Sequence, residues 1–410
     1  MRILYCSFFF TTNEGSYSSR GQHTASALAA RGHDVTVLCV NHRRSNRNHS
    51  KKLQRHQTDG CEILSLPISY EQAFRKRYRV VAFFRYAVKV RQMMGQIDHD
   101  LVFATSTPIT AGFPSTFLNF SGKRKPFVFE SRDLWAQMMV EMKVAKSPRM
   151  GQMLINAERK IYRAADHCIG LAPGIVEDMI DAGVPSANAH LIPNGADIHL
   201  MTPGDRFDLN LPGVKDRDFV AIFAGAHGIA NGLDALLDVA AELKRRKENN
   251  VKLVFIGEGA EKPKLLARAA TEGLDNCLFF DAMPKVELAK IIGCANVGLM
   301  CLPGYKTFAY GTSPNKFFDH LAAGRPQVVN YRGWTADLVR EHNCGIAVEP
   351  NDPGAMADAI IKLRDDTSLS CTMGDNARRL AESKFSWDLL TPQFCDTIEQ
   401  AGGLNGQKRH

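Results

Sequence analysis

The chain has 410 residues, of which 45% are apolar and 23% are charged, and its formal net charge is +8. This length is more than one ordinary hydrophobic core uses and suits two domains, and the composition excludes a disordered chain. The apolar runs stop well short of the ~20 residues of a membrane-spanning helix, and ten cysteines without a Cys-x-x-Cys pair favour reduced thiols in the cytoplasm.

Strands and helices alternate along the chain in two cycles. The first cycle is expected at residues 2–9, 23–32, 34–40, 101–106, 127–131 and 167–172. After a stretch rich in Pro, Gly and Asp, the second is expected at residues 219–225, 232–246, 251–259, 277–283, 297–302 and 326–330. This alternation predicts an α/β fold of two Rossmann-like, doubly wound domains with parallel sheets, facing each other across a cleft. Ligands in such sheets bind at the carboxyl ends of the strands.

A glycine-rich turn follows the first strand of each cycle. The two turns read TTNEGSYSSRG at Thr11–Gly21 and AGAHGIANG at Ala224–Gly232. Glycine lets the backbone approach a ligand closely, and the helix after each turn favours an anion at its N-terminus. The first turn lacks the Gly-x-Gly-x-x-Gly spacing of a dinucleotide site, so an ordinary strand-to-helix loop stays as the alternative.

A short apolar helix opens in an unusual way within Tyr310–Val329. Thr312 or Ser313 can cap this helix and Pro314 suits its first position, which puts Lys316 in the first turn. A cation there is unfavourable by roughly a few tenths of a kcal/mol or more, because the helix dipole is already positive at that end. A bound phosphate would offset this cost. The alternative is a lysine that is only solvated.

Carboxylates offer a second set of candidates. Asp319 lies one turn after the lysine and can accept hydrogen bonds from ribose hydroxyls. Asp98–Asp100 and Asp216–Asp218 match the Asp-x-Asp pattern that holds metal–nucleotide complexes, but both precede strands and are expected at the amino ends of the sheets, away from the ligand. The histidines show no His-Glu-x-x-His motif, so no metal is expected.

The positive charge is concentrated in the first half, where residues 1–203 contain 26 Lys and Arg against 16 Asp and Glu. Asn41–Gln57 has no acid and is expected to be a solvated loop. Phe74–Val90 predicts an amphipathic helix. Its apolar arc is expected to contain Val80, Val81, Phe84, Ala87 and Val88, opposite Arg75, Arg79, Arg85 and Lys89. Such a helix can dock on an anionic leaflet, and the alternative is a helix packed on the sheet with a wet cationic face.

Several segments together resemble one family. SPNKFFDHLAAGRPQVV resembles the donor-binding segment of the retaining glycosyltransferases of family four, which have the two-Rossmann GT-B fold. FESRDLW, LIPNGAD, FIGEGAEKPKL and KFSWDLL resemble further segments of that family, and the likeness covers nearly the whole chain. In particular the chain is similar to the branch that builds bacterial surface polysaccharides, the O-antigen and capsule amino-sugar transferases.

The resemblance implies roles for individual residues. The donor would be held by Gly15, Ser16, Arg20, His227, Gly228, Gly257, Pro314, Asn315, Lys316 and Asp319. Arg132 and Asp133 would serve the sugar or the acceptor, and together with Lys316 they are the catalytic candidates. Two positions depart from the family pattern: Gly311 stands where a glutamate is usual, and Ala136 replaces a proline. The first departure removes a carboxylate expected on the donor sugar, so donor identity stays open.

The resemblance also implies a domain plan and a reaction. Residues 1–203 would bind the acceptor, residues 204–383 would bind the nucleotide sugar, and residues 384–410 would form a helix crossing back to the first domain. The reaction would be metal-independent transfer, with retention, from a nucleoside diphosphate sugar to a lipid-linked or growing surface polysaccharide. Family habit favours UDP, and retention would follow from front-side attack with the leaving phosphate as base or, alternatively, from Asp133 as nucleophile.

The expected partners are a polyprenyl-diphosphate-linked glycan and an anionic membrane, at the cytoplasmic face of the cell membrane, with no nucleic acid. Two alternatives stay open. A nucleotide-sugar 2-epimerase of the same fold would release a free epimer without any acceptor. An RNA-binding protein would use the basic loop and helix, but the loop lacks the aromatic residues that stack on bases.

Overall fold

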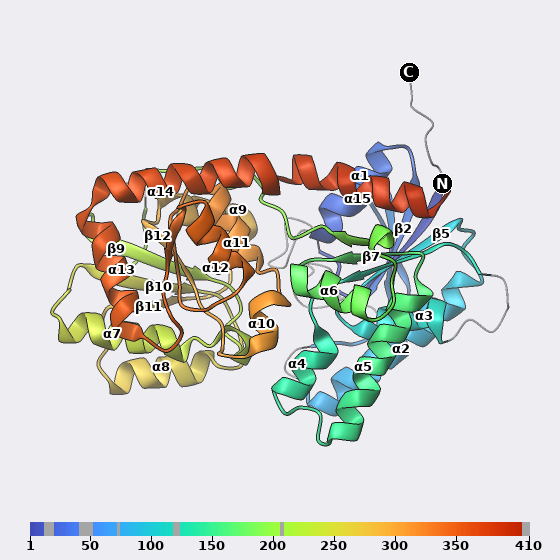
Figure 1. Cartoon of the computed structure of the whole chain (residues 1–410), viewed down its shortest axis with the longest axis horizontal. Coiled ribbons are helices and arrows are strands. Elements are labelled where there is room, and N and C mark those ends of the chain that lie inside the picture. The colour runs from blue at the N-terminus through green and yellow to red at the C-terminus, as the bar shows by residue number, and fades with distance from the viewer. Residues whose placement is uncertain (12–19, 41–51, 72–73, 118–123, 206–208, 404–410) are drawn as a thin grey trace. The chain divides into compact units, whose positions relative to one another are not determined.

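A computed structural model describes residues 1–11, 20–40, 52–71, 74–117, 124–205 and 209–403 of the chain. The chain divides into two compact units (Figure 1). Unit 1 comprises Met1–Pro193, Tyr310–Ser313 and Asp388–His410, and unit 2 comprises Asn194–Ala309 and Pro314–Trp387. Gly15 and Ser16 lie outside the described residues, as do residues 41–51 of the basic stretch.

Unit 1 is built on an eight-stranded sheet with the order β3-β4-β2-β1-β5-β6-β7-β8. Its strands are β1 (Arg2–Ser7), β2 (Asp34–Val40), β3 (Gln54–Thr58), β4 (Cys61–Leu66), β5 (Leu101–Thr105), β6 (Phe127–Ser131), β7 (His167–Gly170) and β8 (Ala189–Leu191). All neighbours pair in parallel except β3 and β4, which are antiparallel. The expected loop over Asn41–Gln57 is therefore wrong at its end, where β3 forms an exposed edge strand.

Helices cover both faces of this sheet. They are α1 (Arg20–Ala30), α2 (Lys76–Met94), α3 (Phe113–Thr116), α4 (Trp135–Glu141), α5 (Pro148–Ala164), α6 (Pro173–Asp181) and α15 (Trp387–Ala401), with short turns η2 (Ile109–Gly112) and η3 (Ser186–Asn188). α1 and α15 lie on one face, and α2, α3 and α5 lie on the other (Figure 1). Strands up to β4 are added on one side of β1, and strands from β5 onward are added on its other side. Because each crossover is right-handed, the helices of the two halves lie on opposite faces of the sheet.

α15 joins unit 1 although it comes from the end of the described chain. Phe394 packs edge-on against Phe103 of β5, with ring centroids 5.0 Å apart. Arg31, just after α1, forms ion pairs with Asp396 at 2.6 Å and with Glu399 at 3.0 Å. Through these contacts α15 covers part of the sheet of unit 1, although the rest of that unit comes mostly from residues 1–193.

Unit 2 holds a six-stranded, fully parallel sheet with the order β11-β10-β9-β12-β13-β14. Its strands are β9 (Phe219–Ala224), β10 (Val251–Ile256), β11 (Cys277–Phe280), β12 (Val297–Met300), β13 (Gln327–Val329) and β14 (Gly345–Ala347). Its helices are α7 (Asp234–Arg245), α8 (Lys262–Thr271), α9 (Lys285–Cys294), α10 (Lys306–Tyr310), α11 (Asn315–Ala322), α12 (Trp334–Glu341), α13 (Pro353–Asp365) and α14 (Thr367–Leu380), with turns η5 (Ile229–Asn231) and η6 (Ala381–Phe385). Both sheets confirm the predicted α/β class with two parallel-sheet domains.

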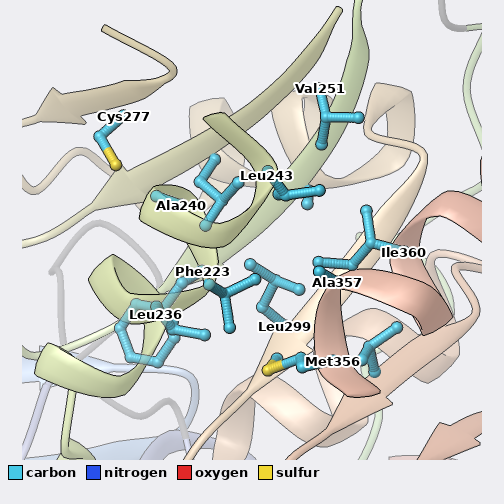
Figure 2. Close-up of a cluster of buried hydrophobic side chains, with 14 of the residues drawn as sticks. Phe223, Leu236, Ala240, Leu243, Val251, Cys277, Leu299, Met356, Ala357 and Ile360 are labelled. Atoms are coloured by element: carbon cyan, nitrogen blue, oxygen red, sulfur yellow. The ribbon is translucent and has the colours of Figure 1, made fainter. Parts of the chain in front are cut away.

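The core of unit 2 lies between the sheet and helices α7 and α13 (Figure 2). Leu236, Leu243 and Ile360 point from these helices toward Phe223 and Leu299 of the sheet, and all five are fully buried. Burying an aliphatic side chain of this size stabilises a fold by about 1.5–3 kcal/mol. This packing fixes the strands β9 and β12, from whose carboxyl ends the candidate site is built.

Candidate functional site

The candidate site begins at the N-terminus of α11. This helix starts at Asn315, and Pro314 occupies the N-cap position without a side-chain hydrogen bond. The prediction that Thr312 or Ser313 caps the helix is wrong, because the helix begins one residue later than that pattern requires. The residue at the N-cap position therefore supplies no side-chain cap, and the N-terminal end of such a helix is suited to an anion.

Lys316 is held in a half-buried position within that first turn. Its Nζ donates to Oδ1 of Asn231 at 2.7 Å and lies 4.8 Å from the centre of the Phe223 ring. Burial lowers the pKa of the ammonium to about 8, and the neighbouring Cys301 thiol acts in the opposite direction. A lysine ammonium that has lost part of its hydration in this way favours a negative charge beside it.

Asn231 is a site residue that the sequence did not single out. It lies in η5, within the glycine-rich turn after β9, and its Nδ2 donates to the carbonyl of Ala226 at 2.7 Å. Its side chain therefore joins the turn after β9 to α11, which lies 85 positions later in the chain. The only signal in the sequence is its place in AGAHGIANG.

Glycines let the turns after β9 and β10 pack backbone against backbone. Gly257 has a φ of +151°, and a Cβ there would lie 1.9 Å from the carbonyl oxygen of Gly225. A Cβ on Gly225 would lie 2.8 Å from Cε of Lys316, and one on Gly259 would lie 2.1 Å from the carbonyl oxygen of His227. Side chains at these positions would separate the two turns or displace the lysine, so the glycines shape the site.

His227 occupies the middle of this packing. Its backbone N–H donates to the carbonyl of Glu258 at 2.9 Å, and its carbonyl accepts from the N–H of Glu261 at 2.9 Å. The imidazole is fully buried beside the rings of Phe223, Phe255 and Phe279, and neither ring nitrogen has a hydrogen-bond partner among the described residues. Burial, with the nearby Lys262 ammonium, lowers its pKa to about 4.

The neighbouring Gly228 is more open than the histidine. Nothing lies within 4 Å of where its Cβ would be. Of the two residues that the resemblance places near the donor phosphates, Gly228 can therefore present its backbone, whereas the His227 side chain faces the protein interior.

Lys262 fixes the same turns from the first position of α8. Its ammonium donates to the carbonyls of Gly257 at 3.0 Å and Phe280 at 3.1 Å, and to the carboxylates of Glu258 at 2.9 Å and Asp281 at 2.6 Å. The side chain is almost fully buried, so one ammonium ties the carboxyl ends of β10 and β11 together.

Asp319 lies one turn after Lys316 on the buried side of α11. Its Oδ1 pairs with Nζ of Lys285 at 3.3 Å, and the two side chains are only 12% and 13% exposed. Lys285 opens α9 and was not among the residues selected from the sequence. The carboxylate that the resemblance assigns to the ribose is thus paired with the ammonium of Lys285, which comes from the connection between β11 and α9.

The catalytic candidates of unit 1 follow strand β6. The N–H of Arg132 donates to Oγ of Ser106 at 2.9 Å, and burial raises the pKa of Asp133, with the Arg132 guanidinium partly offsetting this. Asp133 forms an isolated antiparallel backbone bridge with Thr312, and the N–H of Leu134 donates to the carbonyl of Gly311 at 3.3 Å. The segment that leads into α11 is thus part of unit 1.

Arg20 takes a structural position within unit 1. Its guanidinium is 1% exposed and donates to Oε2 of Glu130 at 2.7 and 2.9 Å. It also donates to the carbonyls of Ile192 at 2.9 Å and Pro193 at 2.6 Å. The resemblance assigns Arg20 to the nucleotide sugar, but in this structure its guanidinium N–H groups donate to acceptors inside the protein.

A hollow of about 540 Å³ lies elsewhere on unit 2, at the amino ends of β9 and β10. Its lining includes Lys215, Arg217, Lys247 and Lys252. The residues described above gather at the opposite, carboxyl ends of these strands, where open α/β sheets bind their ligands. The Asp-x-Asp pair at Asp98–Asp100 also lies at an amino end and forms ion pairs with Arg2.

Two family models match the chain. Residues 17–195 match the "Glycosyl transferase 4-like domain" and residues 207–380 match the "Glycosyl transferases group 1". Over 266 residues the chain is 26% identical to the D-inositol 3-phosphate glycosyltransferase of Salinispora arenicola, covering 61% of this chain and 58% of that protein. The enzyme of the same name from Corynebacterium jeikeium is 29% identical over 269 residues, 62% of each chain. The chain thus spans about three fifths of the length of the curated relatives that it matches.

Solved structures share the fold over nearly the whole chain. Sucrose-phosphate synthase from Thermosynechococcus elongatus superposes with a TM-score of 0.77 at 19% identity, covering 98% of this chain and all of that one. HepE of Anabaena, solved with UDP and glucose, gives a TM-score of 0.68 at 17% identity, covering 97% and 99%. WaaG, a glycosyltransferase involved in lipopolysaccharide biosynthesis, gives 0.69 at 15% identity, covering 97% and 99%.

The two family models divide the chain much as the two units do, and the structural neighbours span both units. Among the described residues, no helix combines the length and the apolar character that crossing a membrane requires. From the paired family models and the shared two-sheet architecture, the chain belongs to the family 4 glycosyltransferases with the GT-B fold.

Proposed function

We propose that this chain transfers a sugar from a nucleoside diphosphate donor to a lipid-linked or growing surface polysaccharide. The observation that carries the proposal is Lys316, a half-buried ammonium in the uncapped first turn of α11, held by Asn231. The helix dipole and the burial both disfavour a cation there. A bound diphosphate reverses both effects, because it places negative charge beside the ammonium and at the positive end of the helix dipole.

The same groups suit the chemistry of the leaving group. Breaking the bond between sugar and diphosphate develops negative charge on the phosphate oxygens. Lys316 and the backbone N–H groups of α11 would take up this charge, and the open backbone of Gly228 lies in the adjoining turn. We propose that these groups act without a metal and that the anomeric configuration is retained, as the family resemblance implies.

UDP is the proposed nucleotide. HepE of Anabaena was solved with UDP-glucose, and an Escherichia coli neighbour of the same fold was solved with UDP-2-fluoro glucose. These complexes support a uridine donor, and Asp319 with its partner Lys285 is proposed to receive the ribose. Arg132 and Asp133 of unit 1 are proposed to act on the sugar or the acceptor.

The exposed face of α2 supports an acceptor that is presented at a membrane. Five of its large apolar side chains are about half exposed: Tyr78 51%, Val80 49%, Val81 48%, Phe84 52% and Val88 49%. Arg77, Arg85 and Lys89 are exposed on the same helix, and no acid lies within it. Apolar anchors interleaved with cations are the composition that binds anionic lipid surfaces. We propose peripheral contact with the cytoplasmic face of the cell membrane.

This face corrects the expected packing of α2. Ala87, expected on the apolar arc, is buried, and so are Ala82, Tyr86 and Val90, which lie against the sheet. The helix does pack on the sheet with exposed cations, as the alternative expects, but the side that packs is not the apolar arc expected from the sequence. Tyr86 secures that side by donating its hydroxyl to the carbonyl of Leu38 at 2.8 Å.

The test is a calorimetric screen of UDP, GDP and ADP, with and without magnesium, against wild type and Lys316→Ala. We expect one diphosphate to bind without magnesium, and the variant to lose about 1–3 kcal/mol, the scale of a charge-assisted hydrogen bond. Because the pKa of Lys316 is lowered to about 8, about half of the molecules carry the charged form at pH 8, and binding there should take up about half a proton per site in the wild type only. Lys290→Ala, at an exposed position of α9, is the matched control.

Equal affinity of wild type and Lys316→Ala would overturn the donor site. If a UDP-sugar instead gave free epimer and UDP without any acceptor, the transferase proposal would give way to a 2-epimerase.

A further inference from the structure

Glu158 of α5 is a buried carboxyl that the proposed reaction does not use. It is 1% exposed, and its Oε2 accepts from the backbone N–H of Ala136 at 3.3 Å. Ala136 lies in the first turn of α4, which directly follows Arg132 and Asp133. α4 has no side-chain cap of its own, since Leu134 at its N-cap position makes no such bond. Glu158 thus supplies from another helix the acceptor that the start of α4 lacks.

Tyr162 holds the other end of the same segment. It lies one turn after Glu158 on α5 and is fully buried, with its hydroxyl 3.1 Å from Oγ of Ser131. Ser131 in turn donates to the carbonyl of Asp133 at 3.1 Å. Tyr162 and Glu158, one turn apart on α5, therefore hold the first and the last residue of the segment Ser131–Ala136. Arg132 and Asp133 lie between these two fixed points.

The charge state of Glu158 can be read from its surroundings. Burial raises its pKa to about 8, and the carboxylates of Asp178 and Asp133 act in the same direction, while the N–H of Ala136 opposes them. At neutral pH the group is therefore mainly protonated. A glutamine has the same shape and charge as this form, whereas a leucine fills the space without an acceptor.

We propose that Glu158 is a positioning residue for transfer, which holds the backbone of Ser131–Ala136 so that Arg132 and Asp133 meet the acceptor. The inference rests on the proposed function, because it assigns a purpose to the segment that is proposed to act on the sugar or acceptor. Glu158 itself touches no substrate. Its contribution is to keep the first turn of α4 hydrogen-bonded and the backbone of the preceding residues in a single conformation.

The first experiment needs no substrate. Amide hydrogen exchange of the region 131–141 is compared in wild type, Glu158→Gln and Glu158→Leu, with Glu177→Gln and Glu177→Leu at an exposed position of α6 as matched controls. We expect exchange at least tenfold faster in Glu158→Leu and within threefold of wild type in Glu158→Gln and both controls. Unchanged exchange in Glu158→Leu overturns the inference. If Glu158→Leu fails to fold, faster exchange in the folded Glu158→Gln also overturns it, because the isosteric group should suffice.

The second experiment separates positioning from overall stability. With UDP-glucose, the donor bound in HepE of Anabaena, as the probe, release of UDP is followed in the same variants. Glu158→Leu should keep its affinity for UDP within twofold but lose at least tenfold in kcat, and Glu158→Gln should restore kcat to within threefold. Wild-type kcat in Glu158→Leu overturns the inference. Failure of the wild type to bind any nucleoside diphosphate refutes the proposed function instead, and the exchange experiment still decides the role of Glu158 in holding the segment.

Discussion

At the scale of single residues, the site depends on groups that are far from their usual environment. Lys316 is a cation at the positive end of a helix, and His227 is an imidazole among phenyl rings without a hydrogen-bond partner among the described residues. Each arrangement costs stability, by the helix dipole in the first case and by lost hydration in the second. A protein that keeps such residues gains something else from them, and for Lys316 the proposal is phosphate binding.

The buried imidazole of His227 makes the free energy of unfolding depend on pH. Its folded pKa of about 4 lies below the ordinary value of 6.5, so the unfolded chain binds more protons between these values and stability falls as pH decreases through this window. Between pH 7 and pH 5 we expect a loss of about 2 kcal/mol from this group. His227→Leu should remove that part of the loss in urea unfolding at the two pH values. His199→Leu, at an exposed position, should not, and an identical acid dependence of His227→Leu and wild type would contradict the assignment.

At the scale of elements, the site depends on how strand ends are tied to one another. The residues that could be found from the sequence are those whose signal is local: Pro314, Asn315 and Lys316 appear in a run that breaks a rule of helix starts, and Gly257 follows a clear strand. Asn231 could not be found, because it acts on α11 from a distant connection and breaks no local rule. Lys285 also stands in the first turn of a helix, but its pairing with Asp319 of α11 cannot be read from the sequence. The sequence also missed β3 and misplaced the helix cap, since edge strands and exact helix starts are set by tertiary pairing.

Lys262 offers a test of these ties. Replacing it with methionine leaves the carbonyl of Gly257 without its donor in an almost fully buried place, which costs about 1–3 kcal/mol, whereas the carbonyl of Phe280 keeps the backbone N–H of Gly257 at 3.1 Å. Lys262→Met should therefore lower the free energy of unfolding by roughly 1–3 kcal/mol and weaken UDP binding. The control is Lys264→Met on the same helix, whose exposed pair with Asp234 is worth less than about 1 kcal/mol. Equal destabilisation by the two changes would argue against the tie.

At the scale of the whole molecule, the fold was predictable because it repeats one simple pattern. Two runs of strands and helices gave the class and the parallel sheets, and the family models agree with both. The outward side of α2 was not predictable in detail, because periodicity identifies two sides of a helix without saying which one the sheet covers. Tyr86 and Val90 pack inward, and the exposed side carries Phe84 and Val88 among cations.

That exposed side predicts association with anionic lipid. Wild type should sediment with vesicles of phosphatidylcholine and phosphatidylglycerol but not with phosphatidylcholine alone, and salt should weaken the binding. Phe84→Asp with Val88→Asp should reduce binding at least tenfold, since the change removes apolar anchors and adds repulsion. Leu266→Asp, at an apolar position on α8 of unit 2 that is 43% exposed, serves as the control. The membrane proposal would fail if wild type bound neither kind of vesicle, or if Leu266→Asp bound them as weakly as the double variant.

The return of α15 to unit 1 has a consequence for biosynthesis. Arg31 meets Asp396 across 365 positions of sequence, and Phe394 of the same helix packs on Phe103. At a translation rate of roughly 5–20 residues per second, about 20–70 s separate the emergence of these partners from the ribosome. During that interval unit 1 has its strands but lacks one of its covering helices, while the whole of unit 2 is made. The domain begun first is the one finished last, and its uncovered apolar face is a natural target for chaperones during synthesis.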